Sequence, residues 1–211
     1  MIALTVLLIN GSPHPRGCTY TALREIEKTL HEEGIETRLL HVGRAAIPGC
    51  LGCGACAGKS RCMVYDDLVN EALSLASECD GLIVGSPVHY ASAAGALTAL
   101  LDRMFYAGSR TLANKPAAAV VSARRAGTTA AIDQLNKYFT ISGMPIAGSQ
   151  YWPMVHGNTP EEVMQDLEGL QIMRALARQM AWMIKSFAVA REHGILPPER
   201  EQPRMVTNFI R

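Results

Sequence analysis

Short apolar runs alternate along this chain with longer amphipathic segments, a pattern that predicts strands followed by helices. Residues 3–10 form a continuous apolar run that ends in Gly-Ser-Pro, as expected for a strand buried on both faces. The next segment, 19–33, carries apolar residues at helical spacing and predicts a helix with Thr19 as its N-cap. By the same reasoning we expect strands at 35–42, 81–85, 117–122 and 146–151, and helices at 66–77, 93–105 and 129–142.

The last part of the chain predicts one long helical region. Thr159, Pro160 and Glu162 form a capping box with proline at the first helical position. Apolar residues from 170 to 187 then recur at alternating steps of three and four, which places them on one helical face. We therefore expect residues 1–211 to form a single domain, with a cysteine-rich loop at 49–65 and a C-terminal helix and tail at 159–211.

Strands that alternate with helices predict a doubly wound parallel α/β sheet with helices on both faces. In such sheets, ligands bind at the carboxyl ends of the strands, near the point where the strand order reverses. Three polar loops, at 11–18, 86–92 and 122–128, follow predicted strands. We expect these three loops to meet at one edge of the sheet.

Charge and composition narrow the range of partners. The 211 residues include 20 basic and 19 acidic side chains, and this balance argues against nucleic acid or an anionic membrane surface as a partner. No apolar run is long enough to span a bilayer. Residues 2–9 lack a preceding basic segment and read as a strand, not as a signal peptide, so we expect a cytoplasmic protein. In that compartment, clustered cysteines favour metal binding or catalysis over disulfides.

Four cysteines, Cys50, Cys53, Cys56 and Cys62, lie within thirteen residues, with the spacing C-x2-C-x2-C-x5-C. Thiols at successive steps of three, separated by glycines, are able to converge on one small volume, which suits an iron–sulfur cluster held by thiolates. A zinc site and an oxidation-prone loop without metal are the alternatives. Zinc is less favoured because structural zinc sites pair two short ligand units across a longer spacer.

The loop after the first predicted strand is suited to bind phosphate. It combines hydroxyl groups, two potential cations and a helix N-terminus, and it contains no carboxylate. It is neither a Walker loop nor a G-x-G-x-x-G turn; the alternative is an ordinary strand–helix turn. Its candidate binding residues are Ser12, His14, Arg16, Gly17, Cys18 and Thr19.

The other two loops are suited to hold a planar heterocycle. The loop at 86–92 offers a stiff backbone with flat polar rings. The loop at 122–128 offers guanidinium groups that can stabilise negative charge on a reduced ring. A surface turn and a solvated basic turn are the alternatives. The candidates are Pro87, Val88, His89, Tyr90 and Ser92 in the former, and Ser122, Arg124, Arg125 and Gly127 in the latter.

Several of these motifs together resemble the NADPH-dependent FMN reductase family of flavodoxin-like proteins, and within it the iron–sulfur flavoproteins. The motifs are Gly11-Ser12-Pro13 with Gly17 and Thr19, the cysteine segment followed by Asp66-Asp67, and Gly85-Ser86-Pro87-Val88 leading into Gly95-Ala96-Leu97 and Leu101-Asp102-Arg103. The resemblance spans about residues 1 to 155.

This resemblance implies a five-stranded sheet of order 2-1-3-4-5 with one FMN per chain. The FMN phosphate would lie in the first loop, and the isoalloxazine ring between the second and third. It also implies a [4Fe–4S] cluster on the four clustered cysteines and a homodimer or homotetramer. The sequence departs from the family at Cys18, where asparagine is common, and at His89, where an aromatic residue is common. We expect the helix N-terminus to lower the pKa of Cys18. For His89 the alternatives are that it tunes or protonates the flavin, or that it only replaces the aromatic ring.

The implied activity is that of an NAD(P)H-dependent oxidoreductase that passes electrons from flavin to the cluster, or to a small or ferredoxin-like protein acceptor. No side chain is required as a catalytic acid or base, because flavin N5 carries the chemistry. One alternative is a flavodoxin-type electron carrier that binds FMN without using nicotinamide. Another is a zinc- or thiol-based sensor on the same scaffold.

Overall fold

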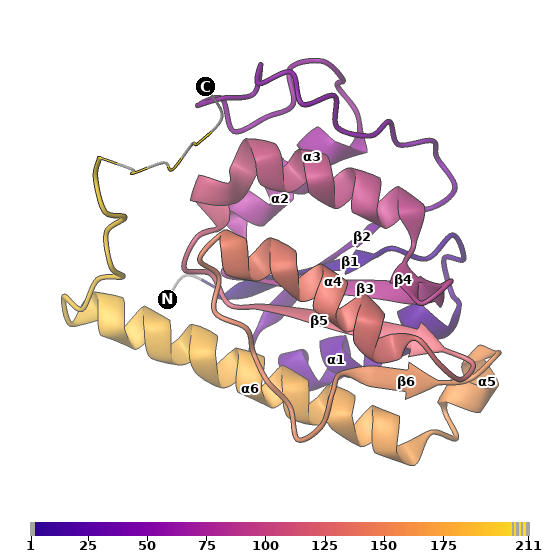
Figure 1. Ribbon diagram of the computed structural model, residues 1–211. Helices are drawn as coiled ribbons and strands as arrows, with labels where there is room; N and C mark the ends of the chain where they lie inside the picture. Colours follow the sequence, from indigo (N-terminus) through magenta and orange to yellow (C-terminus); the bar gives the residue numbers. More distant parts are fainter. Residues whose placement is uncertain (1–2, 204, 206, 208, 210–211) are drawn as a thin grey trace.

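The computed structural model describes residues 3–203, 205, 207 and 209, so the predicted tail lies partly outside the described residues, at 204, 206, 208, 210 and 211. Its centre is a parallel sheet of order β2-β1-β3-β5-β6 (Figure 1). The strands are β1 (Thr5–Asn10), β2 (Glu36–His41), β3 (Gly81–His89), β5 (Ala117–Ala123) and β6 (Met154–His156). The two-residue strand β4 (Ser92–Ala93) only folds back on the end of β3, so the predicted order 2-1-3-4-5 is confirmed.

Helices cover both faces of this sheet. One face carries α1 (Cys18–Glu32) and the long α6 (Leu167–Glu192), and the other carries α2 (Leu68–Glu78), α3 (Gly95–Leu112) and α4 (Thr128–Ile141) (Figure 1). A single-turn helix, α5 (Pro160–Val163), follows β6. Among the described residues, we find no helix with the length and apolar character needed to cross a membrane.

The apolar runs of the sequence become strands buried on two sides. In β1, Val6 and Leu8 pack against α1 and α6, whereas Leu7 and Ile9 pack against the helices of the opposite face. Because successive side chains of a strand point to opposite faces, a strand covered on both sides needs an unbroken apolar sequence. This requirement explains why the run at the start of the chain shows no alternation.

Helices α2 and α5 begin at side-chain caps, and the sequence analysis predicts the one at Thr159. Asp67 accepts a hydrogen bond from the Val69 backbone N–H and begins α2. Thr159 accepts one from the Glu162 N–H, and the Glu162 carboxylate accepts the N–H of Asn158, the residue before the cap, which forms a variant of the predicted capping box. The predicted cap of the first helix is wrong, because α1 begins at Cys18 with Gly17 as its N-cap and Thr19 lies inside the helix.

Two further element predictions are wrong. The fifth strand lies at 154–156, and residues 146–151 contribute only an isolated bridge between Ile146 and Ala117. The C-terminal helical region is interrupted after α5, because Asp166 begins a new helix by accepting the Gly169 N–H. The second oxygen of this carboxylate accepts the His156 N–H, so Asp166 also ties the start of α6 to β6.

Candidate active site: a cleft at the strand ends and a four-cysteine pocket

The three polar loops meet at the carboxyl edge of the sheet, as predicted, and enclose a cleft of about 650 Å³. Loops that follow β1, β3 and β5 form its walls, and the loop between β6 and α5 forms a fourth. Most of the predicted binding residues line it: Ser12, His14, Arg16, Gly17, Cys18, Thr19, Pro87, Val88, His89, Ser122 and Arg124. The cleft therefore lies where ligands bind in doubly wound sheets.

Four predicted residues, Tyr90, Ser92, Arg125 and Gly127, do not line the cleft. Tyr90 is fully exposed and has a positive φ of 50°, so its ring does not cover the core. Gly127 also has a positive φ, and a Cβ there would lie 2.7 Å from the Ala91 Cα. Gly127 thus permits the loop after β3 to pack against the loop after β5, which is a structural role.

The first turn of α1 presents unpaired donors to the cleft. Gly17 caps the helix without a side-chain hydrogen bond, and the first turn holds no acidic residue. The first helical bond runs from the Thr21 N–H to the Gly17 carbonyl, which leaves the three preceding N–H groups without a backbone acceptor in the described part of the chain. Such a helix end attracts an anion through its free donors and its dipole.

A buried hydroxyl pair joins the first and third loops. The Oγ1 of Thr19 lies 2.8 Å from the Oγ of Ser122, and both residues are almost fully buried at the cleft wall. One hydroxyl donates to the other, so one hydroxyl hydrogen remains free for a further acceptor. Polar groups kept at such depth fit a ligand with polar atoms of its own.

The sequence analysis missed the residues that hold the first loop in shape. Fully buried Asn10 accepts the Ser12 N–H through Oδ1 and donates to the Pro15 carbonyl. His41, at the end of β2, hydrogen-bonds to the Ser12 carbonyl at 2.9 Å. A polar residue at the end of an apolar run was the signal available for Asn10. His41 gave no signal, because only the sheet order brings β2 beside this loop.

The sequence analysis also missed the fourth wall of the cleft, formed by Gly157, Asn158, Thr159 and Pro160. The Cys18 thiol donates to the Gly157 carbonyl across 3.6 Å and links this wall to α1. Burial raises the pKa of Cys18, and the carboxylates of Glu161 and Glu162 add to this effect; together they outweigh the lowering by its backbone N–H. The expected lowering by the helix N-terminus is therefore wrong, and Cys18 is a neutral thiol.

All four clustered cysteines line a second pocket, which lies between the loop that precedes α2 and helix α3. Cys50 and Cys53 are exposed, Cys56 and Cys62 are half-buried, and Arg103 and Tyr106 from α3 complete the wall. In the described residues, no group of three or more metal-binding side chains is arranged around a metal position. The three glycines between the cysteines, Gly52, Gly54 and Gly58, have open space at their Cβ positions, and all three have positive φ. The donor set and a permissive backbone thus suit a thiolate-ligated group.

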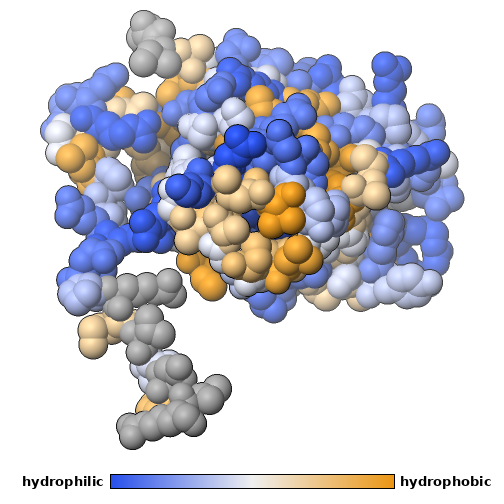
Figure 2. All heavy atoms as spheres, turned by 90° about the horizontal axis from the view of Figure 1, so that it is seen from above, coloured by the Kyte–Doolittle hydropathy of each residue, from blue (hydrophilic) through white to orange (hydrophobic). Residues whose placement is uncertain are grey.

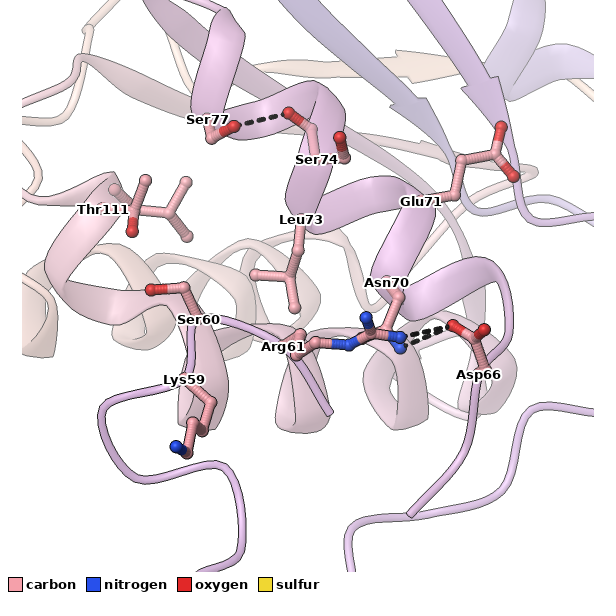
Figure 3. Close-up of a pocket in the computed structure, with 11 residues that line it drawn as sticks. Lys59, Ser60, Arg61, Asp66, Asn70, Glu71, Leu73, Ser74, Ser77 and Thr111 are labelled. Atoms are coloured by element: carbon pink, nitrogen blue, oxygen red, sulfur yellow. Dashed lines mark hydrogen bonds and ion pairs between the residues drawn. The ribbon is translucent and has the colours of Figure 1, made fainter. Parts of the chain in front are cut away.

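Asn70 of α2 fixes the last of these cysteines in place. Its Oδ1 accepts the Cys62 N–H at 2.8 Å, and its Nδ2 donates to the carbonyls of Cys62 and Tyr65. Figure 3 shows Asn70 and Arg61 both directed at Asp66, on the side of the loop that faces a neighbouring polar pocket. The backbone around Cys62 is therefore held by a folded helix.

Arg103, on helix α3, holds the end of the cysteine loop in place. Its side chain is 2% exposed and makes a two-pronged ion pair with Asp67, at 2.6 and 2.9 Å. It also lies 4.8 Å from the centre of the Tyr65 ring. Burial acts to raise the pKa of Cys62, but hydrogen bonds from the Tyr65 N–H and the Arg103 guanidinium outweigh it and hold the pKa below its usual value.

The surface around this pocket is apolar. Leu51, Met63, Val64 and Tyr106 all expose much of their side chains. The view from above in Figure 2 shows hydrophobic side chains gathered on this face of the molecule. The cysteine pocket therefore opens onto a hydrophobic surface, whereas polar atoms make up a larger share of the cleft walls at the strand ends.

The comparison with protein families decides which flavodoxin-like group the site belongs to. A family model described as NADPH-dependent FMN reductase matches residues 4–159. The chain belongs to this family. The matched region contains the cleft loops and the cysteine pocket, so this FMN reductase-family protein is a flavin-dependent oxidoreductase.

Curated relatives point to one branch of the FMN reductase family. An iron–sulfur flavoprotein of Methanocaldococcus jannaschii is 33% identical over 196 residues, which cover 86% of this chain and 98% of the relative. An iron–sulfur flavoprotein of Methanosarcina thermophila is 27% identical over 177 residues, covering 82% and 91% of the two chains.

Solved structures confirm the fold of this FMN reductase-family chain. RosB, solved with bound 8-demethyl-8-formylriboflavin-5'-phosphate, superposes with a TM-score of 0.67 at 15% identity and covers 99% of this chain and 96% of its own. A flavodoxin from the domain Archaea gives a TM-score of 0.58 at 14% identity, covering 86% and 99%. The fold is flavodoxin-like.

Proposed function

We propose that this protein is an NAD(P)H-dependent oxidoreductase of the iron–sulfur flavoprotein type, with FMN in the cleft and a [4Fe–4S] cluster on Cys50, Cys53, Cys56 and Cys62. The observation that carries the proposal is the presence, in one chain, of a cleft with an open helix N-terminus and a separate pocket lined by four thiols. The family match supports FMN, and the names of the relatives support the cluster.

In this proposal the first loop binds the FMN phosphate. The free N–H groups at the start of α1 donate to phosphate oxygens, and Arg16 at the cleft wall adds a positive charge. The hydroxyls of Thr19 and Ser122 bind beside the phosphate or the ribityl chain. Asn10 and His41 keep the loop in the required shape before the ligand enters.

The loops after β3 and β5 bind the flavin ring. Pro87 and Val88 lie against its flat face, and Arg124 steadies negative charge at its carbonyl edge. His89, which is exposed at the cleft, hydrogen-bonds to the ring and tunes it. When bound, the flavin supplies hydride acceptance and single-electron transfer. The chain itself binds and orients the ring beside a nicotinamide dinucleotide.

Around the cysteines, the role of the chain is to hold thiolates in place. Arg103 and the backbone N–H groups near Cys62 favour the deprotonated sulfur that a cluster requires. Electrons leave to a small acceptor or to a ferredoxin-like protein. We further propose that the protein works as a homodimer or homotetramer in the cytoplasm.

Anaerobic purification tests the cofactors. We expect a visible spectrum of flavin and cluster, with about one FMN and about four iron and four sulfide per chain. Substitution of Cys53 by serine should remove most of the iron and leave the flavin, whereas Cys79→Ala, at a buried cysteine outside the pocket, should leave both. Bound zinc with no iron would contradict the cluster, and failure to take up FMN would contradict the whole proposal.

Kinetics separates the enzyme from a carrier. We expect steady oxidation of NADPH or NADH with quinone-like acceptors. Fast reduction by a ferredoxin-like donor with no oxidation of either nucleotide would replace this assignment with a flavodoxin-type electron carrier.

A further inference from the structure

The outer edge of β5 has a one-residue gap. Ala117 exchanges backbone hydrogen bonds with Pro145 and Ala147, and the Val121 N–H next donates to the Pro153 carbonyl. Between these points the chain from 148 to 152 leaves the sheet. Alternate residues of a strand direct their N–H and C=O groups to the same side, so those of Ala119 point into the gap. Neither group has a hydrogen-bond partner among the described residues.

A pocket of about 370 Å³ lies over this gap, between α4 and residues 146–153. Asn136 of α4 lines it, and its Oδ1 is buried without a hydrogen-bond partner in the described structure. Buried polar groups are almost always paired, with protein, water or ligand. One donor and two acceptors therefore converge on the same pocket with no protein group to satisfy them.

Two aromatic residues line the opening. Tyr151 and Trp152 remain 54% and 56% exposed, and their rings meet edge to face with centroids 4.9 Å apart. Each therefore keeps flat surface free for another ring. None of the residues at this pocket lines the flavin cleft or the cysteine pocket.

We propose that this pocket binds the 6-aminopurine ring of an adenine-containing ligand. The exocyclic amino group has two hydrogens, one for the Ala119 carbonyl and one for Asn136 Oδ1, and the neighbouring ring nitrogen accepts the Ala119 N–H. The rings of Tyr151 and Trp152 supply stacking surface. A 6-oxopurine presents a carbonyl to the same two acceptors and is rejected. The volume suits one base with its sugar, since it lies at the small end of ligand pockets.

Calorimetric titration of the purified, FMN-saturated protein with adenosine tests the proposal, and inosine is the matched probe. Adenosine carries no phosphate and thus avoids competition for the anion site at α1. We expect one site per chain and at least tenfold weaker binding of inosine. Trp152→Ala should weaken adenosine binding about tenfold. Trp182→Ala, at an exposed tryptophan on α6, should leave it unchanged.

Asn136→Leu provides a second variant. We expect it to weaken the binding of adenosine about fivefold and to reduce the difference in affinity between adenosine and inosine. Absence of adenosine binding, equal binding of the two nucleosides, or binding indifferent to Trp152→Ala would each overturn the proposal. These outcomes do not depend on cluster content or on turnover. If adenosine binds and NADH displaces it, the natural ligand is the adenylate half of the dinucleotide; if both bind together, it is a separate adenine compound.

Discussion

The side chain of Arg103 contacts several segments of the cysteine loop, which its place in the sequence does not indicate. It pairs with Asp67, the N-cap of α2, and its guanidinium also approaches the carbonyls of Pro48 and Tyr65 at 3.4 Å. Both ends of the cysteine loop are thus attached to one buried side chain of α3. A lysine carries the same charge but lacks the planar fork that makes several bonds at once.

We expect Arg103→Lys to lower the free energy of unfolding by about 2 kcal/mol, because two charge-assisted bonds become one. The cysteine loop should also exchange amide hydrogens faster, since both of its ends loosen. Urea denaturation and hydrogen exchange over residues 48–67 measure the two effects. Arg110→Lys, at an exposed arginine on the same helix, serves as the control. Unchanged exchange in the loop would contradict this role.

Asp67 makes this anchor sensitive to acid. Burial acts to raise the pKa of Asp67, but the hydrogen bonds from Arg103 and the Val69 N–H prevail and hold the pKa below its ordinary value. A carboxylate with a depressed pKa in the folded state stabilises the fold at pH values above its unfolded pKa. This stabilisation is lost as the pH falls through the folded pKa.

Asp67→Asn keeps a good N-cap while removing the charge. Its deficit in unfolding free energy relative to the wild type should therefore be largest near neutral pH and shrink as the pH falls to about 3. Denaturation series at several pH values give the two curves. Parallel curves would show that the charge of Asp67 makes no contribution.

The position of α1 over β3 determines the shape of the cleft, because the first turn of α1 forms part of the cleft wall. Gly85 of β3 permits this close approach, since a Cβ there would lie 2.9 Å from both Thr19 Cγ2 and Leu23 Cδ1. A side chain at this position must displace the side chains of Thr19 and Leu23, or the helix that carries them. Thr19 lines the cleft, so the displacement extends to the cleft wall.

Gly85→Ala is expected to cost about 1–3 kcal/mol of unfolding free energy through overpacking, and to weaken FMN binding. Gly95→Ala, at the start of α3 with nothing within 4 Å of its Cβ position, is expected to be neutral or slightly stabilising. Denaturation and flavin-fluorescence titration compare the pair. Equal unfolding free energies of the two variants would mean that Thr19 and Leu23 make room for the added methyl group without loss of stability.

In the molecule as a whole, the two functional features are built separately. The cleft proposed for FMN lies at the strand ends, and the cysteine pocket lies against α3 and the loop before α2. The two share no lining residue, and distant independent sites behave additively. The cleft should therefore form whether or not the cysteines carry a metal.

We expect the Cys53→Ser protein to bind FMN with an affinity within about twofold of the wild type, because its cleft is unchanged. Flavin-fluorescence titration of apoprotein, with and without iron, measures this directly. A large loss of flavin affinity would show that the loop and the cleft are coupled, within one chain or between neighbouring copies.

Amino-acid pattern was enough to predict the parallel sheet, most helices and the edge where the loops meet. Apolar runs such as 81–85 and 117–122 are long and uninterrupted, and burial on both faces permits few other structures. The three loops could be located for the same reason, since strand ends fix where the connections lie. The cysteine spacing likewise predicts the pocket that the four thiols share.

Contacts between distant segments settled the rest. The segments 146–151 and 154–156 both carry apolar residues, and only pairing with Val121 and Ala123 selected the latter as the fifth strand. His41 and Asn70 gave no local signal, because their partners lie 29 and 8 residues away. The gap at Ala119 exists only once the edge strand is in place. A hydrophobic pattern reports which face of an element is buried, whereas hydrogen-bond partners across the fold depend on how the elements pack.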